Sequence, residues 1–524
     1  MAVDGVSLEV FRNLLASVAE EMGVALGRSA FSTSIKERRD YSCAVFGPDG
    51  AMVAQAAHIP VHLGAMTASV RAGLERLELG PGDVAILNDP YLGGTHLPDV
   101  SVMAPVHDEA GELLGYLANR GHHADIGGMA PGSLPLSTEL YQEGVIIPPL
   151  KLVDGGRLNE PLLELICRNT RTPEERRGDF AAQLAAIRTG ERRLLGLVER
   201  HGAATVHEHM TAVLDHAEAL TRAALRMVPD GTYAFKDAME GDGVSDEPLP
   251  IRCAATFADG HVTFDFTGTS AQTPGCINTP LAVTESAALY VARCLAGADV
   301  PANDGVKRAV TVVAPAGSLV NAQAPHAVSG GNVETSQRIT DVLLGCVAQA
   351  LPDRIPAADQ GTMNNVLLGG TDPRTGKPFV YYETTAGGHG GGPSGSGASG
   401  VQSHMTNTLN TPIEALEFAF PMRVRRYAMR RGSGGEGFHA GGDGILREIE
   451  FLAPGHLTLI SERRSTSPYG LAGGGDGMPG RSMLRRASQS GEGEELPAKA
   501  ERDVAAGDML RLETPGGGAW GAVP

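Results

Sequence analysis

The side chains best suited to chemistry gather in two short segments within the first quarter of the chain. The segments read NDPYLGGTHLPD at 88–99 and NRGHHADIGG at 119–128. Together they supply three aspartates and three histidines: Asp89, His96, Asp99, His122, His123 and Asp125. Imidazoles with carboxylates are usual ligands of Zn²⁺, Mn²⁺ and non-haem Fe²⁺, and two or three histidines with one carboxylate leave a position open for water or substrate. The segments therefore suggest a divalent metal site.

Spacing alone favours a second interpretation, in which these residues form polar surface loops. Asp89 and Asp99 both adjoin prolines and would then act as turn formers. The histidines would be hydrogen-bonded to the backbone. Both interpretations stay open on the residues alone.

Other polar residues near these segments have weaker signals. Asp40, in KERRDYSCAVF, precedes a predicted strand and offers a further carboxylate ligand, although the pattern favours an ion pair with a preceding arginine on a solvated face. His58 and His62 are four apart, but Pro60 between them indicates a loop or a helix start. We interpret both histidines as packing or substrate-pocket residues rather than ligands.

The second half of the chain holds a further polar cluster, SGGNVE at 329–334, just before a predicted helix. Asn332 is expected to cap that helix, and anion binding at the helix N-terminus is the alternative. Three residues of the glycine-rich end are candidates for contact with a substrate: His389, His404 and Asp476.

The elements that must position these residues follow from hydrophobic spacing. Apolar residues recur three and four apart over 6–28, which predicts an amphipathic helix, and residues 41–55 predict a hairpin around Gly-Pro-Asp-Gly. The first part of the chain also predicts a helix over 65–78, strands over 84–87, 101–106 and 113–119, and helices within 157–227. The two metal-ligand segments thus adjoin strand ends, where loops commonly carry function.

The chain changes character after the Pro229-Asp230-Gly231 turn. Strands and turns dominate there, with helices expected near 282–296 and 335–350 and glycine-rich loops after 386. We predict an α+β fold with a helix-rich N-terminal region, 1–228, and a β-rich, glycine-loop C-terminal region, 229–524. Four histidines of the helical stretch are expected to be exposed: His201, His207, His209 and His216.

Composition excludes several classes of protein. The net charge of −18 over 524 residues argues against nucleic acid and against an acidic membrane surface as partners. Six dispersed cysteines without a CxxC spacing argue against a zinc ribbon or a disulfide framework, and they favour a cytoplasmic protein. The 69 glycines, nearly twice the usual share of about 7%, lack the period of collagen and fall in clusters. We expect no signal peptide and no membrane span.

Nucleotide-binding motifs are not convincing in this chain. GSGASG at 395–400 satisfies GxGxxG only within a glycine-rich stretch and opens no regular helix, and RTGKP at 374–378 lacks the Ser or Thr of a Walker loop. We therefore expect that the chain does not itself bind ATP.

Five motifs in consistent order resemble one family over nearly the whole chain. They are NDPYLGGTHLPDV, GHHADIGGMAPGSLP, YQEGVIIPPLKL, SGGNVETSQRITD and TPGGGAWG. They are similar to the hydantoinase B/oxoprolinase family, which includes the second subunit of ATP-dependent N-methylhydantoinase, the matching half of 5-oxoprolinase, caprolactamase, and subunits of acetone and acetophenone carboxylases.

The resemblance implies a division of labour between two subunits. A hydantoinase A-type partner with an actin-like ATPase fold, using ATP and Mg²⁺, would phosphorylate the substrate, and this chain would act on the activated species as part of an (AB)₂ heterotetramer. The implied cofactor is a divalent metal (Zn²⁺, Mn²⁺ or Fe²⁺). His96, Asp99 and one histidine of GHHADIGG match its ligands, His122 and His123 being indistinguishable here, and Asp40 is a further candidate.

The implied activity is ATP-dependent hydrolysis of a C–N bond in a small cyclic amide, such as a hydantoin, 5-oxoproline or another lactam. The metal would lower the pKa of water and supply hydroxide. Asp99 or Asp125 would orient or deprotonate that water, and whichever of His122 and His123 is not a ligand would protonate the leaving group. The chain length is closer to the hydrolase members than to the longer acetone carboxylase subunit.

Three alternatives remain at this point. The chain could be a subunit of an ATP-dependent ketone carboxylase, it could be a non-catalytic scaffold for the ATPase subunit, or it could be a stand-alone metallohydrolase that needs no ATP.

Overall fold

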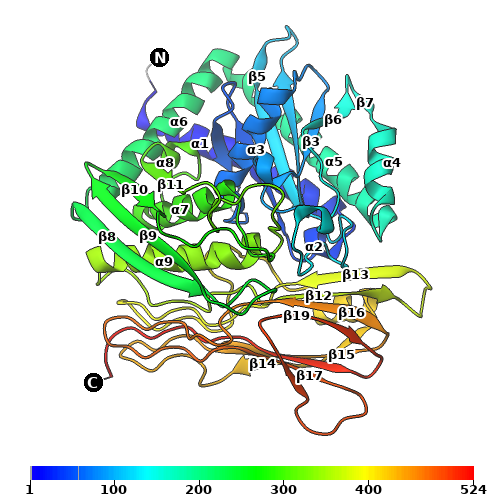
Figure 1. Ribbon diagram of the computed structural model, residues 1–524. Helices are drawn as coiled ribbons and strands as arrows, with labels where there is room; N and C mark the ends of the chain where they lie inside the picture. The colour runs from blue at the N-terminus through cyan, green and yellow to red at the C-terminus, as the bar shows by residue number, and fades with distance from the viewer. Residues whose placement is uncertain (1–2, 57, 524) are drawn as a thin grey trace.

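The computed structural model describes residues 3–56 and 58–523, and this part of the chain has an α+β architecture that contains four β-sheets. Figure 1 shows the helix-rich part, drawn in blue to green, lying against two sheets formed by the C-terminal residues, drawn in yellow to red. The α+β class predicted from the sequence is confirmed.

The first sheet is antiparallel and has seven strands in the order β2-β1-β5-β4-β3-β6-β7. Its strands are β1 (Tyr41–Phe46), β2 (Met52–Gln55), β3 (Val84–Leu87), β4 (Asp99–His107), β5 (Leu113–His122), β6 (Leu150–Asp154) and β7 (Arg157–Leu158). The surrounding helices are α1 (Gly5–Ser29), α2 (Thr33–Lys36), α3 (His62–Arg76), α4 (Glu160–Arg168), α5 (Pro173–His201) and α6 (Ala203–Leu225).

Helices cover both faces of the central strands, so alternate residues of each strand point toward different helices. Cys43 and Leu117 belong to the core shared with α1 and α5. Ala44 and Ala118 belong to the core shared with α3 and with α7 (Leu281–Ala296). This double coverage explains why the strands read as continuous apolar runs rather than as alternating ones.

Local sequence signals explain where the first helices begin. Asp4 accepts hydrogen bonds from the backbone N–H groups of Val6 and Ser7 and so caps α1, close to the predicted start. The predicted exposure of four histidines of the helical stretch is wrong: His201, His207 and His216 are half-buried, and His209 of α6 is buried and stacks on Phe11 of α1 at 3.8 Å between ring centroids. The apolar face of α6 that packs against α1 includes this position.

The second sheet has the order β11-β10-β9-β8, with β10 and β11 parallel. It consists of β8 (Gly231–Met239), β9 (Leu249–Ala258), β10 (His261–Asp265) and β11 (Val310–Val313), followed along the chain by the π-helical turn η3 (Gly331–Thr335) and α9 (Ser336–Ala350). Residues 336–348 of α9 are all buried, since this helix packs against β8, β9 and α7. The short helix α8 (Asp304–Lys307) precedes β11.

The C-terminal residues form two further sheets that enclose a core between them. One contains β12 (Asn365–Thr371), β13 (Pro378–Glu383), β16 (Gly455–Ile460) and β19 (Lys499–Val504). The other contains β14 (Met422–Arg430), β15 (Gly444–Phe451), β17 (Arg481–Arg485), β18 (Glu494–Leu496) and β20 (Met509–Glu513), and α10 (Ile413–Ala419) precedes it. Short 3₁₀ turns η1 (Pro90–Leu92) and η2 (Leu140–Gln142) lie in the first part of the chain.

The glycine clusters after 386 pack backbone against backbone. The N–H of Gly442 donates to the carbonyl of His389, and the N–H of Gly517 donates to the carbonyl of Gly442. A Cβ atom at Gly388 would lie 2.0 Å from the oxygen of Gly442. The glycine excess therefore has a structural cause here, because larger residues would separate these segments.

The predicted elements are largely confirmed. The helix expected at 6–28 is α1, the hairpin at 41–55 is β1–β2, and the helices near 282–296 and 335–350 are α7 and α9. The division of the chain at 228 stays a prediction; residues from before it, such as Ile59 and Leu134, also pack in the core of the second sheet. Among the described residues, no helix combines the length and the apolar character that crossing a membrane requires.

Candidate metal centre

Strand register brings Asp99 and His122 together. Asp99 is the first residue of β4 and His122 is the last residue of β5, and the two are directly paired in the antiparallel ladder. Their side chains therefore project from the same face of the sheet, the face covered by α3. The Nδ1 atom of His122 lies 3.1 Å from Oδ1 of Asp99.

The loop between β3 and β4 positions His96 next to Asp99. Asn88 holds this loop, since its amide donates to the carbonyls of Leu97 and Val145 and its oxygen accepts from Ile147. Asp89 accepts from the N–H of Tyr91 at 2.9 Å and starts η1, so this aspartate is a turn former. The loop lies close to α3 at Gly93, where φ is 86° and a Cβ atom would lie 2.5 Å from Ala68.

Asp99 is the hub of the resulting cluster. Its Oδ2 atom accepts hydrogen bonds from Thr95 Oγ1 at 2.6 Å and from Asn332 Nδ2 at 3.2 Å. The Nε2 atoms of His96 and His62 lie 3.3 Å and 3.4 Å from the same oxygen. These four side chains and His122 are all buried, so the carboxylate has no exposed edge.

The donor set fits a divalent metal. One ligand atom from each of His96, Asp99 and His122 can be chosen so that all three lie within 4.8 Å of one another. Within the described part of the chain, Nε2 of His122 is buried without a hydrogen-bond partner, and Nε2 of His96 has only the Asp99 carboxylate, 3.3 Å away, beside it. Orphaned buried nitrogens are costly unless something binds them, and two imidazoles with a carboxylate suit Zn²⁺, Mn²⁺ or Fe²⁺.

Electrostatics in the cluster favour a cation. Burial raises the pKa of Asp99, but the charges on His96 and His62 outweigh burial and hold this pKa well below its usual value. Burial lowers the pKa of His96, yet the Asp99 carboxylate outweighs it and the net shift is upward. For His122, burial dominates and lowers the pKa. A metal ion would take the place of the proton that His96 otherwise shares with Asp99.

Asp40 lies beside the cluster. It pairs with Arg38 at 3.4 Å, as the ion-pair interpretation predicted, but the expected solvated face is wrong, because both side chains are buried. Arg38 also lies 4.4 Å over the ring of Tyr382. Asp40 lines a cavity of about 20 Å³ together with Asp99 and His122, so it faces the candidate metal site.

The comparisons with known proteins agree with this picture. A model of the Hydantoinase B/oxoprolinase family matches residues 4–523. The chain belongs to this family.

Relatives within the family differ in length. 5-Oxoprolinase 1 of Arabidopsis thaliana is 40% identical over 99% of this chain, which spans only 42% of that protein. A relative from Pseudomonas sp. strain NS671, named as the B-type subunit of a D-/L-hydantoinase, is 31% identical, and the match covers 99% of this chain and 90% of that one. The chain thus spans about two-fifths of the 5-oxoprolinase and nearly all of the hydantoinase relative.

Two solved structures share the fold of this family member. ATP-dependent caprolactamase from Pseudomonas jessenii superposes with a TM-score of 0.92 at 28% identity, covering 100% of this chain and 92% of that chain. Nucleotide-free acetone carboxylase superposes with a TM-score of 0.88 at 17% identity, covering 98% and 76%, and at this identity the likeness concerns the fold alone.

Two of the predicted catalytic residues lie away from the cluster. His123 is one residue beyond β5 and points to the opposite side, where Nε2 lies 3.0 Å from Oε1 of Gln183 in α5. Burial lowers the pKa of His123 to about 4. Asp125 is fully buried, and its carboxylate accepts from the backbone and side chain of Arg171. The structure therefore brings His96, Asp99, His122 and Asp40 together but not His123 or Asp125.

Two further residues of the cluster had other expected roles: His62 was expected to be a packing or substrate-pocket residue, and it does line the small cavity, whereas Asn332 was expected to cap a helix. His62 opens α3 and lies at Asp99, and its Nδ1 is 2.8 Å from Ser42 Oγ. The predicted capping role of Asn332 is wrong, because η3 has no side-chain cap and the Asn332 amide donates to Asp99 instead. The polar SGGN motif at 329–332 was the sequence feature that could have placed Asn332 at the site. For His62 the spacing from His58 suggested a shared helix face, but Pro60 between them argued against a helix there.

Proposed function

We propose that this chain is the B-type subunit of an ATP-dependent cyclic amide hydrolase, acting on an intermediate that a partner ATPase subunit has phosphorylated. The observation that carries the proposal is the buried cluster of His96, Asp99 and His122, in which Asp99 and His122 line a water-sized cavity and Nε2 of His122 has no hydrogen-bond partner among the described residues. Family membership and the likeness to a caprolactamase support it. The free thiols fit a cytoplasmic setting.

The chemistry follows from the weakness of an amide as an electrophile. Phosphorylation of the amide oxygen makes the carbon imidate-like. Water then adds to this carbon, the C–N bond breaks once the ring nitrogen gains a proton, and the remaining acyl phosphate is hydrolysed to carboxylate and phosphate. A divalent metal held by His96, Asp99 and His122 would lower the pKa of water and polarise the reacting carbon.

Residues of this chain supply the proton transfers. His62 is oriented by Ser42 at Nδ1, so its Nε2 atom can hold or release a proton at the edge of the cluster. The Asp40 carboxylate faces the same cavity, where it can accept a proton from water. Asn332 and Thr95 fix the Asp99 oxygen by hydrogen bonds and so keep the ligand in place.

The segment 58–62 lies between two cavities. His58 and Pro60 line an outer cavity of about 500 Å³, whereas Ile59, Val61 and His62 line the inner cavity of about 20 Å³. The outer volume suits a small cyclic amide, and the inner one holds about one water molecule. Substrate would bind in the outer cavity and reach the metal when this segment shifts.

The partner in this proposal is a hydantoinase A-type ATPase subunit, assembled with this chain as an (AB)₂ heterotetramer that uses ATP and Mg²⁺. The hydantoinase relative, itself named as one subunit of its enzyme, supports such a partnership. A ketone carboxylase subunit is the second candidate, and it has weaker support because acetone carboxylase shares only the fold at 17% identity.

Co-purification with the partner tests the proposal. We expect ATP hydrolysis that depends on 5-oxoproline, a hydantoin or caprolactam, requires both chains, and needs no bicarbonate. Substrate-dependent turnover that requires bicarbonate and a ketone would instead assign a carboxylase. Ring opening by the isolated chain without ATP would assign a stand-alone metallohydrolase, and full activity of metal-free complex would leave this chain as a scaffold.

A further inference from the structure

A second group of ligand-type side chains lies around α9. Asp341 belongs to α9, Asp359 follows it in the connection to β12, and His404 lies in the long loop between β13 and α10. One ligand atom from each can be chosen so that all three lie within 4.8 Å of one another, and Asp341 and Asp359 are each only 1% exposed. The candidate metal centre described above contains none of these residues.

The distances in this group are too long for hydrogen bonds. The Nε2 atom of His404 lies 3.6 Å from Oδ1 of Asp359 and 3.9 Å from Oδ1 of Asp341. Two ligands bonded at about 2.1 Å to one tetrahedral ion lie roughly 3.4 Å apart. The observed spacing is therefore closer to that of ligands around an ion than to that of direct hydrogen-bond partners.

Unpartnered oxygens point to a missing ligand. Among the described residues, Oδ1 of Asp341 and Oδ2 of Asp359 are buried without a hydrogen-bond partner. The other oxygen of Asp341 accepts from Arg463 at 2.8 Å, and the other oxygen of Asp359 accepts from the N–H of Gly361 at 2.9 Å. The free oxygen of Asp341 is also the one nearer His404, whereas the oxygen of Asp359 nearer His404 accepts from Gly361 and its Oδ2 is free; unpaired buried carboxylate oxygens are costly.

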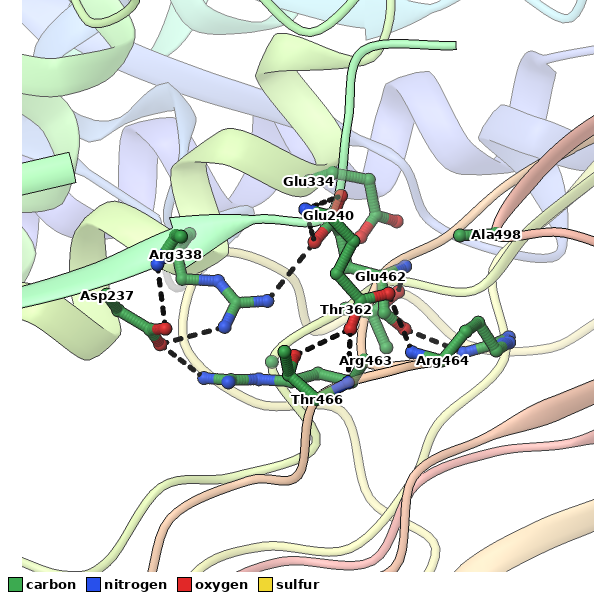
Figure 2. Close-up of polar contacts among 12 residues, drawn as sticks. Asp237, Glu240, Glu334, Arg338, Thr362, Glu462, Arg463, Arg464, Thr466 and Ala498 are labelled. Atoms are coloured by element: carbon green, nitrogen blue, oxygen red, sulfur yellow. Dashed lines mark hydrogen bonds and ion pairs between the residues drawn. The ribbon is translucent and has the colours of Figure 1, made fainter. Parts of the chain in front are cut away.

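The positive charges nearby are already engaged. Figure 2 shows Asp237 between the guanidinium groups of Arg338 and Arg463, and the distances are 2.8 Å and 2.7 Å. Arg338 also pairs with Glu462. Asp341 therefore shares Arg463 with Asp237, and Asp359 has no such partner within the part of the chain that the structure describes.

The backbone at His404 is held in an unusual conformation. Its φ is 54°, in the left-handed region that a histidine adopts only when surrounding contacts enforce it. Gln337 of α9 supplies such contacts, because its amide donates to the carbonyl of Ser403 and accepts from the N–H of Met405. Tyr290 Oη lies 3.4 Å from Nδ1 of His404, so Nδ1–H can donate to it while Nε2 faces the carboxylates.

We propose that Asp341, Asp359 and His404 form a second divalent cation site, of the nitrogen-and-oxygen type that suits Mn²⁺, Fe²⁺ or Zn²⁺. The ion ties α9 to the 403–406 segment. This segment supplies Met405 and Thr406 to the cavity of the first cluster, so the second ion fixes a wall of the catalytic pocket without touching the substrate. The inference goes beyond the proposed function and does not depend on it.

Counting bound manganese tests the second site directly. The full chain, stripped with a chelator, is titrated with Mn²⁺ while electron paramagnetic resonance measures the free ion. We expect two equivalents for the wild type, one for Asp359→Asn, one for His96→Ala and none for the double variant. An Asp359→Asn variant that binds as many equivalents as the wild type would overturn the proposal, whatever the first cluster binds.

Matched variants separate ion loss from general damage. Asp304→Asn and His209→Gln replace a buried aspartate and a buried histidine elsewhere, and both should retain two equivalents. His404→Gln provides a second variant if Asp359→Asn lacks native circular dichroism. A crystal of the wild-type chain soaked in Mn²⁺ should show an anomalous peak between His404 and Asp359, and its absence would reject the site even if both variants unfold. These counts require neither ATP nor lactam, so failure of the proposed hydrolysis would not affect them.

Discussion

The two clusters, one next to η3 and the other around Asp341 of α9, use similar ligands in different surroundings. The first has two histidines and one aspartate beside a cavity, and its aspartate accepts from the neutral donors Thr95 and Asn332. The second has two aspartates and one histidine, and Arg463 engages one carboxylate. Catalytic metal sites keep an open position, whereas structural sites are closed. On this comparison we propose that the first cluster carries the chemistry and that the second fixes the pocket wall.

Removal of the Asp99 carboxylate should have the largest effect. Asp99→Asn takes away the charge around which His62, His96 and His122 gather, so we expect loss of one metal equivalent and a fall in lactam-dependent turnover of at least about a thousandfold. Metal analysis and steady-state kinetics of the complex measure both. Asp125→Asn is the matched control, because that carboxylate is equally buried but pairs with Arg171, and it should keep the metal. Metal loss in Asp125→Asn alone would reverse the assignment.

Substitution of the adjacent residues His122 and His123 should give the next largest difference, because only His122 faces Asp99. His122→Gln should lower turnover by at least about a hundredfold and remove the metal, since Nε2 of His122 is a free ligand atom. His123→Gln should retain the metal and instead cost about 1–3 kcal/mol of unfolding free energy, because Gln183 loses its buried partner. Metal content together with urea unfolding distinguishes the two results. Equal metal loss in both variants would contradict the separation of the two rings.

The first cluster was accessible from the sequence because its ligands are close together along the chain, in segments that flank β4 and β5. The choice between His122 and His123 was not accessible. The predicted strand ended at 119, whereas β5 continues to His122, and only that extension lets the two-residue alternation place His122 on the side of Asp99. A short error at a strand end thus hid which imidazole faces Asp99.

The second cluster could not be predicted in the same way. Asp341, Asp359 and His404 come from a helix, a connection and a long loop, and no spacing in the sequence links them. Only His404 was noted, as a candidate for substrate contact. Their convergence results from the packing of α9 against the C-terminal segments, which is a tertiary property. The overall α+β class was predictable because long amphipathic and apolar runs determine it locally.

The buried charged residues next to the second cluster, which include Glu334 and Glu462 (Figure 2), should make a smaller contribution to the unfolding free energy that depends on pH. Burial, together with the charge of Glu462, raises the pKa of Glu334 to about 8, whereas an unfolded glutamate titrates near ~4.3. Between these values the folded protein holds a proton that the unfolded chain releases, so this group's stabilising contribution is complete below ~4.3 and is lost as the pH rises towards 8. From pH 6 to pH 8 the wild type should therefore lose about 2 kcal/mol more unfolding free energy than the Glu334→Gln variant, which has no carboxyl group at this position.

Urea unfolding of the wild type and the variant at both pH values measures this difference. Glutamine keeps the carbonyl oxygen that accepts from Asn365 and Met363, so the hydrogen bonds of the site survive the change. Identical pH dependence in the two proteins would show that Glu334 is ionised in the folded state. Retention of both manganese equivalents in the variant would separate this network from the ligands of the second cluster.

The smallest expected effect concerns Asn332, which joins α9 to the first cluster. Asn332→Ala removes one hydrogen bond to the Asp99 carboxylate but no metal ligand, so we expect about a tenfold fall in kcat with both metal equivalents retained. Gln337→Ala is the companion variant, since it releases Ser403 and Met405 on the side of the second cluster and should raise KM more than it lowers kcat. Metal loss in Asn332→Ala, or a change of the same kinetic constant in both variants, would reject the division into a catalytic first cluster and a second cluster that fixes the pocket wall.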